Sequence, residues 1–241
     1  MSALLKINNL WGGYQEGVDI LRGISMEVQQ GEAVGIIGLN GSGKSTFGKA
    51  IMNMIPIRKG EILFEGEDIT ALSTSELSHR GISIMQQGGK VFRNLSVWDN
   101  LQLAGKGNNS QFSILNSQLT ELVPLLQHSK KELQHLMADK LSGGQKHQLS
   151  LAMTLATNPR LVILDEPSAG LSPKAVEEMY QMLSAIRERL DVTFFLIEQN
   201  IAKAVEFCDW SVLFQQGQIA DCIIGNRINE IVNKMFNINM L

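Results

Sequence analysis

A glycine-rich run at residues 38–46 constrains the fold more than any other feature of the chain. It reads Gly-Leu-Asn-Gly-Ser-Gly-Lys-Ser-Thr, which fits the phosphate-loop pattern of Gly, four residues, Gly, Lys and Ser or Thr. The apolar run at 33–37 predicts a buried strand before the loop, and apolar residues at helical spacing predict a helix after it. The run is therefore expected to form a strand-to-helix turn in an α/β fold.

The chemistry of this turn predicts a site for nucleotide phosphates. Because Gly41 and Gly43 lack a Cβ, the backbone can curl until successive N–H groups converge on phosphate oxygens beside a helix N-terminus. Lys44 is expected to bridge the β- and γ-phosphates, Ser45 to offer its hydroxyl to Mg²⁺, and Thr46 to add a polar contact. The alternative is a glycine turn without a ligand. It requires a chance match, which average residue usage puts on the order of one per cent.

A second apolar run, at 161–164, ends in Asp165, Glu166 and Pro167. In α/β sheets ligands bind at the carboxyl ends of strands. Asp165 is suited to holding Mg²⁺ directly or through water, and Glu166 to polarising a water for attack on the γ-phosphate. An acidic pair after a strand is otherwise commonly a solvated turn. Its combination with the phosphate loop favours the catalytic interpretation.

Three further polar turns are candidates for the same site. Gln86-Gln87-Gly88-Gly89 follows the apolar run 82–85, where a sensor loop could start. The run 141–145, Leu-Ser-Gly-Gly-Gln, begins a helix whose N-terminus faces an anion, although by spacing alone it could be a simple helix start. The apolar run 192–197 ends at Glu198-Gln199-Asn200, so a third polar group could enter the site.

One aromatic residue is a candidate for contact with the base. Tyr14 lies between two short apolar runs, and its ring could stack on adenine. An isolated Tyr is more often ordinary packing, and Trp11 is a competitor for the same role.

The composition narrows the class of partner and the compartment. A net charge of −3 and a pI near 5.8 give no basic excess, so nucleic acid is not an expected partner. The apolar runs are far shorter than the ~20 residues that span a bilayer. We therefore expect a soluble, cytoplasmic chain, in which Cys208 and Cys222 are buried free thiols and the four histidines have surface or core roles.

The remaining patterns describe a scaffold. Apolar runs at 4–11 and 20–28 predict an antiparallel edge sheet, and residues 73–76 resemble a helix capping box. Ser96 is a plausible N-cap for a short helix through Leu101, and the aromatic residues around it leave core packing and a docking surface both open. After a loop at 105–110, a helical stretch at 111–137 is interrupted at Pro124. Residues 210–214 and 219–222 predict a hairpin, with a closing helix over 228–235.

The chain resembles the nucleotide-binding subunit of an ATP-binding cassette (ABC) transporter. The resemblance lies in the order and spacing of five features, which are the runs 38–46, 141–145 and 163–167, Gln87, and Glu198-Gln199. The likeness covers nearly the whole chain. It implies an α/β fold with a P-loop NTPase core of the ABC ATPase type, an antiparallel β subdomain and a helical subdomain inserted at approximately 92–157. We expect these parts to form a single domain over 1–241.

The resemblance also implies a head-to-tail dimer that sandwiches two ATP molecules with Mg²⁺, in which the 142–144 turn of one subunit covers the γ-phosphate held by the other. It assigns adenine stacking to Tyr14, sensing of Mg²⁺ and water to Gln87, and the docking of a membrane subunit to the region after Gln87. The nucleotide-binding residues are then Tyr14, Gly38, Asn40, Gly41, Ser42, Gly43, Lys44, Ser45, Thr46, Ser142, Gly143 and Gly144. The catalytic residues are Glu166, Gln199 and Gln87, and the Mg²⁺ ligands are Ser45, Gln87 and Asp165.

Within the family, the stretches 167–173 and 197–200 look most like the branched-chain amino-acid importer ATPases, with urea-type importers as close relatives. Ser172 stands where the wider family usually has Asp, and Gln199 stands where it usually has the switch His. The importer branch resembles this chain at both positions, so we interpret them as traits of that branch. Glu166 is retained, which supports activity.

The implied function is an ATP-hydrolysing subunit that powers a transporter, importing branched-chain or related amino acids. Its partners would be transmembrane permease subunits and a second ATPase subunit, identical or different. It would lie on the cytoplasmic face of the inner membrane, bound through those permease subunits. The alternative is a soluble ATP-driven machine with no membrane partner, such as a DNA-repair or ribosome-associated relative. Those usually show two cassettes or long inserts, whereas this chain has one cassette and no basic stripe.

Overall fold

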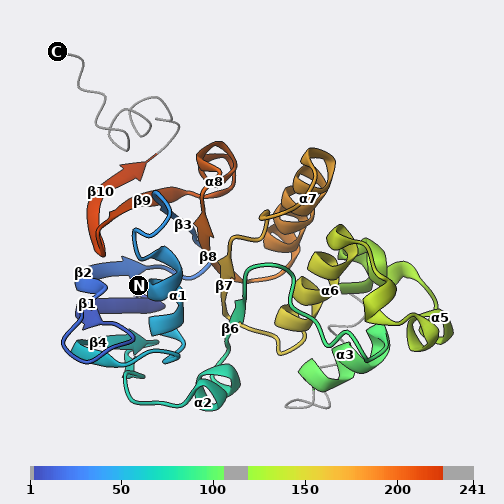
Figure 1. Ribbon diagram of the computed structural model, residues 1–241, viewed down its shortest axis with the longest axis horizontal. Helices are drawn as coiled ribbons and strands as arrows, with labels where there is room; N and C mark the ends of the chain where they lie inside the picture. Colours follow the sequence, from blue (N-terminus) through green and yellow to red (C-terminus); the bar gives the residue numbers. More distant parts are fainter. Residues whose placement is uncertain (1–2, 106–118, 225–241) are drawn as a thin grey trace. The chain divides into compact units, whose positions relative to one another are not determined.

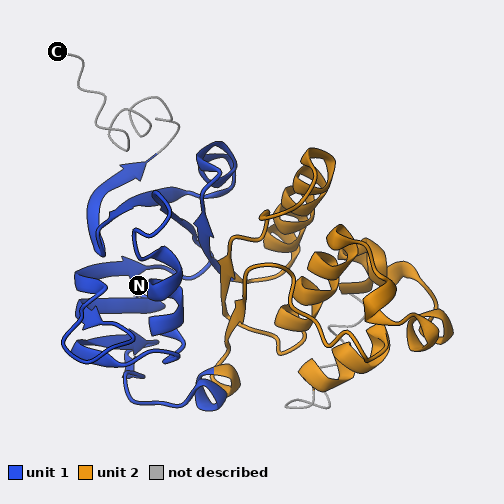
Figure 2. Ribbon diagram, in the orientation of Figure 1, with its two compact units in different colours: residues 1–77, 193–241 blue, residues 78–192 orange. Residues whose placement is uncertain are grey.

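A computed structural model of the chain describes residues 3–105 and 119–224. The chain divides into two compact units, shown in different colours in Figure 2. Unit 1 comprises residues 1–77 and 193–241, and unit 2 comprises residues 78–192. No helix of the described residues is both long enough and apolar enough to cross a membrane.

Unit 1 contains the expected antiparallel sheet. Its strands follow the order β2-β1-β4-β5 and appear in blue to teal in Figure 1. The central strand β1 pairs antiparallel with both β2 and β4, so that Leu5 lies opposite Val28 on one side and Phe64 on the other. All three of these residues are buried. The bounds are β1 Leu5–Gly12, β2 Leu21–Val28, β4 Ile57–Phe64 and β5 Glu67–Asp68.

The second set of strands in unit 1 is mainly parallel and carries the phosphate loop. Strand β3 (Ala33–Ile37) pairs in parallel with β8 (Thr193–Glu198) and with β9 (Trp210–Gln215), and β9 forms an antiparallel hairpin with β10 (Gln218–Ile224). Every residue of β3 and β8 is buried, as expected for parallel strands covered on both faces. The register places Ile37 opposite Glu198, so the loops that follow these two strands begin side by side.

An aromatic cluster fixes the helix after the phosphate loop onto these strands. Phe47 lies on α1 (Lys44–Ile51) and is fully buried. Its ring stacks on Phe214 of β9 at 5.5 Å between centroids, and it meets Phe195 of β8 edge-on at 5.4 Å. Helix α1, which follows the phosphate loop, is thereby packed against β8 and β9, two of the three parallel strands.

Unit 2 combines two parallel strands with a set of helices. Strand β6 (Ile82–Met85) pairs in parallel with β7 (Leu161–Asp165), and Met85 lies opposite Leu164. Helix α6 packs against α3 and against β6. The helices of this unit are α3 Val97–Gly105, the 3-10 helix η1 Pro124–Gln127, α5 Lys130–His135, the 3-10 helix η2 Ala138–Lys140, α6 Gly143–Leu155 and α7 Pro173–Arg189.

Helix starts follow the local sequence signals. Ser73 N donates to Glu76 Oε2 (2.8 Å), and Glu76 N donates to Ser73 Oγ (3.3 Å), which confirms the capping box before α2 (Thr74–His79). Ser96 Oγ accepts from Asp99 N at 3.0 Å and caps α3, which continues past Leu101. In unit 1, Asn200 caps the remaining helix, α8 (Ile201–Phe207).

The helical stretch expected at 111–137, with its interruption at Pro124, agrees with the structure in its described part. Residues 119–122 are helical, and the chain then forms the short η1 from Pro124, because a proline lacks the N–H that continues an α-helix. A new helix then starts at Ser129, whose side chain accepts from Glu132 N. The part of this stretch before residue 119, most of the expected loop at 105–110 and the closing helix at 228–235 lie outside the described residues.

The expectation of two buried thiols is wrong. Cys208 is half-buried, and Cys222 is exposed on β10. Partial desolvation, together with the neighbouring Asp221 carboxylate, raises the pKa of the Cys222 thiol above its ordinary value. This lowers the fraction of reactive thiolate at neutral pH.

The aromatic cluster gives a test of the fold. Phe47→Ala should lower the free energy of unfolding by roughly 3–5 kcal/mol, because it removes a fully buried ring and leaves a cavity. Phe92→Ala makes the same chemical change at a side chain that is 53% exposed, and should change the free energy of unfolding by no more than about 0.5 kcal/mol. Urea unfolding of both variants, followed by circular dichroism, measures the difference. Equal midpoints would show that the cluster does not hold the unit together.

Candidate active site

The phosphate loop is shaped by glycines at the places where another residue would not fit. Gly41 and Gly43 adopt left-handed backbone conformations, with φ of 77° and 105°. A Cβ on Gly38 would lie 2.3 Å from the carbonyl oxygen of Phe214, so β9 can approach this closely only because the residue is glycine. Gly43 is the N-cap of α1 and makes no side-chain capping bond. The first N–H groups of α1 therefore have no side-chain cap and can bind an anion.

Lys44 lies inside the loop that it is expected to serve. The side chain is only 4% exposed, and Nζ donates to the carbonyl oxygens of Gly38 at 2.8 Å and Leu39 at 2.9 Å. Both acceptors are neutral. Because a hydrogen bond from an ammonium to an ionised acceptor is stronger, a phosphate would compete with these two carbonyls for the lysine.

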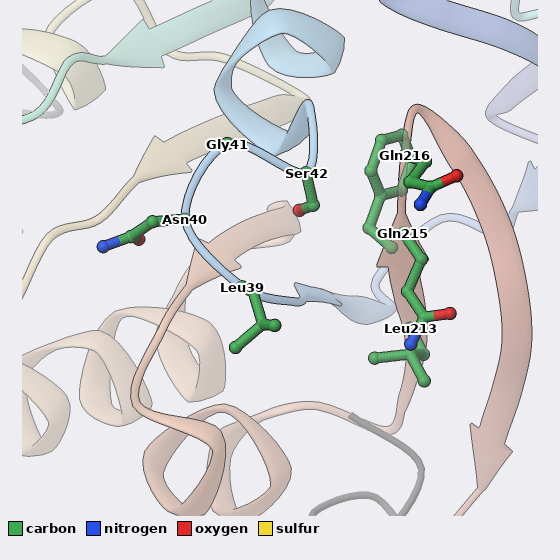
Figure 3. Close-up of a pocket in the computed structure, with 8 residues that line it drawn as sticks. Leu39, Asn40, Gly41, Ser42, Leu213, Gln215 and Gln216 are labelled. Carbon is green, nitrogen blue, oxygen red and sulfur yellow. The ribbon is translucent and has the colours of Figure 1, made fainter. Parts of the chain in front are cut away.

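A cavity of about 310 Å³ lies between the phosphate loop and the end of β9. Figure 3 shows the loop residues Leu39 to Ser42 on one wall and, on the other, residues 213–215 at the end of β9 with Gln216 of the turn that follows. Ser42 Oγ is buried and has no hydrogen-bond partner among the described residues, while its carbonyl accepts from Gly217 N at 2.8 Å. No motif in the sequence pointed to the β9 wall, because a hairpin signal gives no indication of which loop the strand will border.

Tyr14 presents an open ring beside α1. The side chain is 51% exposed, and Lys49 Nζ, from α1, donates to its hydroxyl at 3.4 Å. The turn that carries Tyr14 is held by Arg58, which pairs with Asp19 and donates to Val18 O. An exposed ring on a fixed turn next to the phosphate-loop helix suits stacking on a base.

Trp11, the competing aromatic residue, is already engaged. Its Nε1 donates to Asn9 Oδ1 at 3.0 Å, and Lys59 Nζ lies 5.7 Å from the ring centroid. Lys49 Nζ lies at a similar 5.8 Å from the Tyr14 ring centroid, so the lysine contacts do not separate the two residues. Tyr14 is favoured as the stacking residue because it is exposed, whereas Trp11 is only partly exposed and its indole N–H is bonded within the sheet.

At the end of β8, Glu198 and Gln199 take different positions. Glu198 is buried, and its Oε2 accepts from Gln199 N at 3.0 Å and from Asn200 N at 3.2 Å, so the carboxylate caps its own turn. The Gln199 side chain is exposed. Because Glu198 pairs in register with Ile37, Gln199 directly follows β8 at the same level at which the phosphate loop directly follows β3.

In unit 2, the structure brings two of the predicted catalytic side chains together. Gln87 Nε2 donates to Glu166 Oε2 at 2.6 Å. Gln87 follows β6 and Glu166 follows β7, and the parallel register of those strands places their ends next to each other. Asp165 is the last residue of β7 and is buried. Glu166 has a φ of 50°, a left-handed conformation that is uncommon outside glycine and concentrates at functional sites.

The turn at 142–144 forms an open helix N-terminus. Ser142 Oγ accepts from Gln145 N at 3.2 Å, and Gln145 Oε1 accepts from Ser142 N at 3.0 Å, which is a complete capping box. Ser142 and Gly143 are exposed, and a Cβ on Gly143 would meet nothing within 4 Å. The first turn of α6 is therefore accessible to a ligand or to another protein chain.

Ser172, which departs from the usual family residue, has a local structural role. Its Oγ accepts from Ala175 N at 3.4 Å and caps α7, whose first residue is Pro173. Asp and Ser are both favoured at helix N-caps, so the substitution preserves this start.

The segment after the Gln87 loop exposes apolar side chains. Phe92, Leu103 and Met137 are 53%, 41% and 38% exposed, whereas Val97 and Leu101 are buried. The fully buried Asn100 holds the segment by accepting from Phe92 N at 2.8 Å and donating to Phe92 O at 3.0 Å. The two alternatives that the sequence left open both apply in part. Val97 and Leu101 belong to the core, and Phe92, Leu103 and Met137 are exposed apolar side chains.

The predicted Mg²⁺ ligands do not form a metal cage by themselves. Among the described residues, no group of three or more histidine, cysteine, aspartate or glutamate side chains could hold a metal ion. A serine hydroxyl and a carboxylate are nevertheless donors of the hard-oxygen type that Mg²⁺ prefers when phosphates and water complete its shell.

Comparison with known proteins identifies the relatives of this chain. Residues 21–169 match the family model described as ABC transporter. The chain is 32% identical to the high-affinity branched-chain amino acid transport ATP-binding protein BraG of Pseudomonas aeruginosa, over 86% of this chain and 87% of the relative. It is 30% identical to the probable branched-chain amino acid transport ATP-binding protein LivF of Archaeoglobus fulgidus, over 90% of each. The lipopolysaccharide export system ATP-binding protein LptB of Escherichia coli is 29% identical over 90% of this chain and 89% of its own.

Solved structures show the same fold. The crystal structure of the ADP conformation of an ATP-binding cassette from an ABC transporter has a TM-score of 0.81 and 26% sequence identity, and covers 98% of this chain and 96% of that one. A nucleotide-free ATP-binding cassette gives a TM-score of 0.81 at 26% identity, with 98% of this chain and 95% of that one covered. The expected α/β fold of the ABC ATPase type is confirmed.

Lys44 gives a direct test of the phosphate loop. Lys44→Ala should weaken ATP binding by roughly 10- to 100-fold, because hydrogen bonds to charged groups contribute about 1.5–3 kcal/mol. Lys6→Ala removes the same charge from an exposed residue that pairs with Glu27 on the antiparallel sheet, and should leave the affinity unchanged. Titration with a fluorescent ATP analogue measures both. An unaltered dissociation constant for Lys44→Ala would rule out the proposed phosphate contact.

Proposed function

The chain belongs to the ABC transporter family, whose cassettes hydrolyse ATP. We propose the following roles for its side chains in binding and hydrolysing ATP. The phosphate loop binds the triphosphate, with Lys44 moving from the carbonyls of Gly38 and Leu39 to the β- and γ-phosphates. The exposed ring of Tyr14 stacks on adenine. The N–H groups that open α1 add donors and dipole charge at the phosphates.

The observation that carries the hydrolytic proposal is the 2.6 Å hydrogen bond from Gln87 to Glu166. It holds the Glu166 carboxylate in one orientation at the end of β7, where a base is required. In the reaction, Glu166 takes a proton from the attacking water while the water oxygen bonds to the γ-phosphorus. The bond between the γ-phosphorus and the bridging oxygen breaks, leaving ADP and inorganic phosphate.

Mg²⁺ is the cofactor that fits the donors on this chain. The Ser45 hydroxyl, the Asp165 carboxylate and the Gln87 side chain would hold the ion, together with phosphate oxygens and water. When bound, Mg²⁺ neutralises part of the charge on the β- and γ-phosphate oxygens. Gln87 then has two functions, one toward Glu166 and one toward the ion.

Gln199 supplies a hydrogen-bond donor where the wider family usually has histidine. Its amide NH₂ can donate to the γ-phosphate or to the attacking water, but it does not titrate and cannot act as a base. Its exposed position, next to the start of the phosphate loop in the strand register, supports this role. Glu166 remains the base in this division of labour.

The open turn at 142–144 supports a partner of the same kind. We infer that Ser142, Gly143 and Gly144 cover the γ-phosphate held by a second ATPase subunit, either a copy of this chain or a related one. The exposure of Ser142 and Gly143, together with the N–H groups at the start of α6 that precede the capped Gln145 N, suits an anion presented by another chain.

The transporter powered by this ATPase is proposed to import branched-chain or related amino acids. The names of the BraG and LivF relatives support that class, together with the stretches 167–173 and 197–200 of this chain. LptB, at a similar identity, serves a different cargo, so family membership alone does not decide the substrate. The exposed apolar side chains of Phe92, Leu103 and Met137 are proposed to dock a permease subunit at the cytoplasmic face of the inner membrane.

Glu166 gives the sharpest test of the chemistry. Glu166→Gln should lower kcat by roughly 10²- to 10⁴-fold while ATP still binds, because the amide keeps a hydrogen bond to Gln87 but cannot accept the proton of water. Glu178→Gln is the matched control on α7, where the carboxylate is exposed and 3.7 Å from Lys174 Nζ. Gln199→Ala should lower kcat less than Glu166→Gln. Phosphate release and ATP binding are measured for all three variants. Turnover of Glu166→Gln at the parental rate would show that Glu166 is not the general base.

Purification of the native complex tests the partners and the cargo. The tagged chain, extracted from its own membranes in mild detergent, should bring permease subunits and a second ATPase subunit with it. In proteoliposomes this complex should take up labelled leucine, isoleucine or valine only when ATP is supplied. Recovery of the chain from the cytosol without membrane proteins would support the soluble alternative. ATP-dependent movement of a different cargo, such as methionine or lipopolysaccharide, would contradict the substrate class.

A further inference from the structure

A buried histidine follows directly after the open turn of α6. His147 is 5% exposed, and its ring folds back on the first helical turn, with Nδ1 2.9 Å from the carbonyl oxygen of Gly143. A carbonyl oxygen can only accept, so Nδ1 carries the proton and donates. In the neutral ring Nε2 is then the acceptor, and it is buried with no hydrogen-bond partner among the described residues. This fixes both the tautomer and the direction of the ring.

The same ring packs against the loop that carries Gln87. A Cβ built on Gly89 would lie 2.8 Å from Nδ1 of His147, closer than real Cβ atoms approach, and 3.0 Å from both its Cγ and its backbone nitrogen. Gly89 is buried and lies two residues after Gln87. Helix α6 also packs against β6, the strand that leads into this loop (Figure 1). His147 therefore contacts the Gln87 loop on one side and the 142–144 turn on the other.

We propose that His147 is a positioning residue that holds the Gln87 loop against the first turn of α6. The inference rests on the proposed roles of Gln87 and of Ser142 to Gly144. With the ring in place, Gln87 is held within hydrogen-bond distance of Glu166, and a shift of the loop cannot occur without a shift of the turn.

Two isosteric variants separate the hydrogen bond from the packing. In His147→Asn, the amide nitrogen stands at the position of Nδ1 and can donate to Gly143 O, whereas His147→Leu has the same branched shape and no donor. We expect His147→Leu to lose roughly 10- to 100-fold in kcat, because small misplacements of catalytic groups cost this much, while the ATP dissociation constant stays at the parental value. His147→Asn should retain most of the parental kcat. Equal turnover in the two variants at equal thermal stability would overturn the proposal.

Two glycine variants test the contact between the ring and the loop. Gly89→Ala and Gly88→Ala both place a side chain at a left-handed backbone position, with φ of 57° and 86°, but a Cβ on Gly88 would meet nothing within 4 Å. Combined with His147→Ala, Gly89→Ala should lower kcat by less than the product of the two single losses, because removing the ring relieves the closest contact and leaves only the contact with the backbone nitrogen of His147. Gly88→Ala should combine multiplicatively. Multiplicative losses in both pairs would contradict direct packing.

A readout that does not need hydrolysis keeps this inference separate from the proposed function. Long-range ¹H–¹⁵N spectra of histidine-labelled protein should show His147 protonated at Nδ1 and unprotonated at Nε2, and the Gly89 amide should shift in both His147→Leu and His147→Asn, because both variants remove the aromatic ring packed against it. The opposite tautomer, or an unperturbed Gly89 amide in both variants, would overturn the positioning role even if the parent protein hydrolyses ATP. Absence of hydrolysis with the expected spectra would instead count against the proposed function.

Discussion

Parallel hydrogen bonding between buried strands determines where each unit of this protein can carry functional groups. In unit 1 the pairing of Ile37 with Glu198 starts the phosphate loop and the Gln199 turn side by side, and in unit 2 the pairing of Met85 with Leu164 does the same for Gln87 and Glu166. Both faces of these strands are covered, so only their ends can present polar groups to a ligand. A shift of either register by one residue would separate the side chains that act together.

The polar groups at these strand ends have partners within the protein. Lys44 donates to two loop carbonyls, Glu166 accepts from Gln87, and Glu198 caps its own turn. Burying an ionised group without a partner is costly, so such pairing stabilises the folded chain. In the proposed binding mode, a phosphate that bonds to Lys44 replaces these neutral acceptors with a charged one. The same side chains would then contribute both to stability and to ligand binding.

The sequence could predict the parts of the site in which local pattern and chemistry coincide. Buried strands followed by Gly38, by Gln87 or by Asp165 are visible as apolar runs that end in polar turns, and their bounds in the structure agree closely. The interruption of the helical stretch at Pro124 was predictable too, because proline lacks the N–H that continues an α-helix, whereas apolar periodicity did not separate the short helices η1 and α5 that follow it. Contacts between distant segments, such as His147 against Gly89, leave no local signal, because each partner looks ordinary in its own stretch.

In the proposed mechanism, the phosphates of ATP replace the carbonyls of Gly38 and Leu39 as partners of Lys44. A crystal structure of Glu166→Gln with ATP and Mg²⁺, in which slowed turnover preserves the triphosphate, tests this replacement. We expect Lys44 Nζ to lie within hydrogen-bond distance of β- and γ-phosphate oxygens and no longer to donate to those two carbonyls. An ATP-bound structure in which Lys44 still donates to those two carbonyls, with the triphosphate elsewhere, would contradict this mechanism.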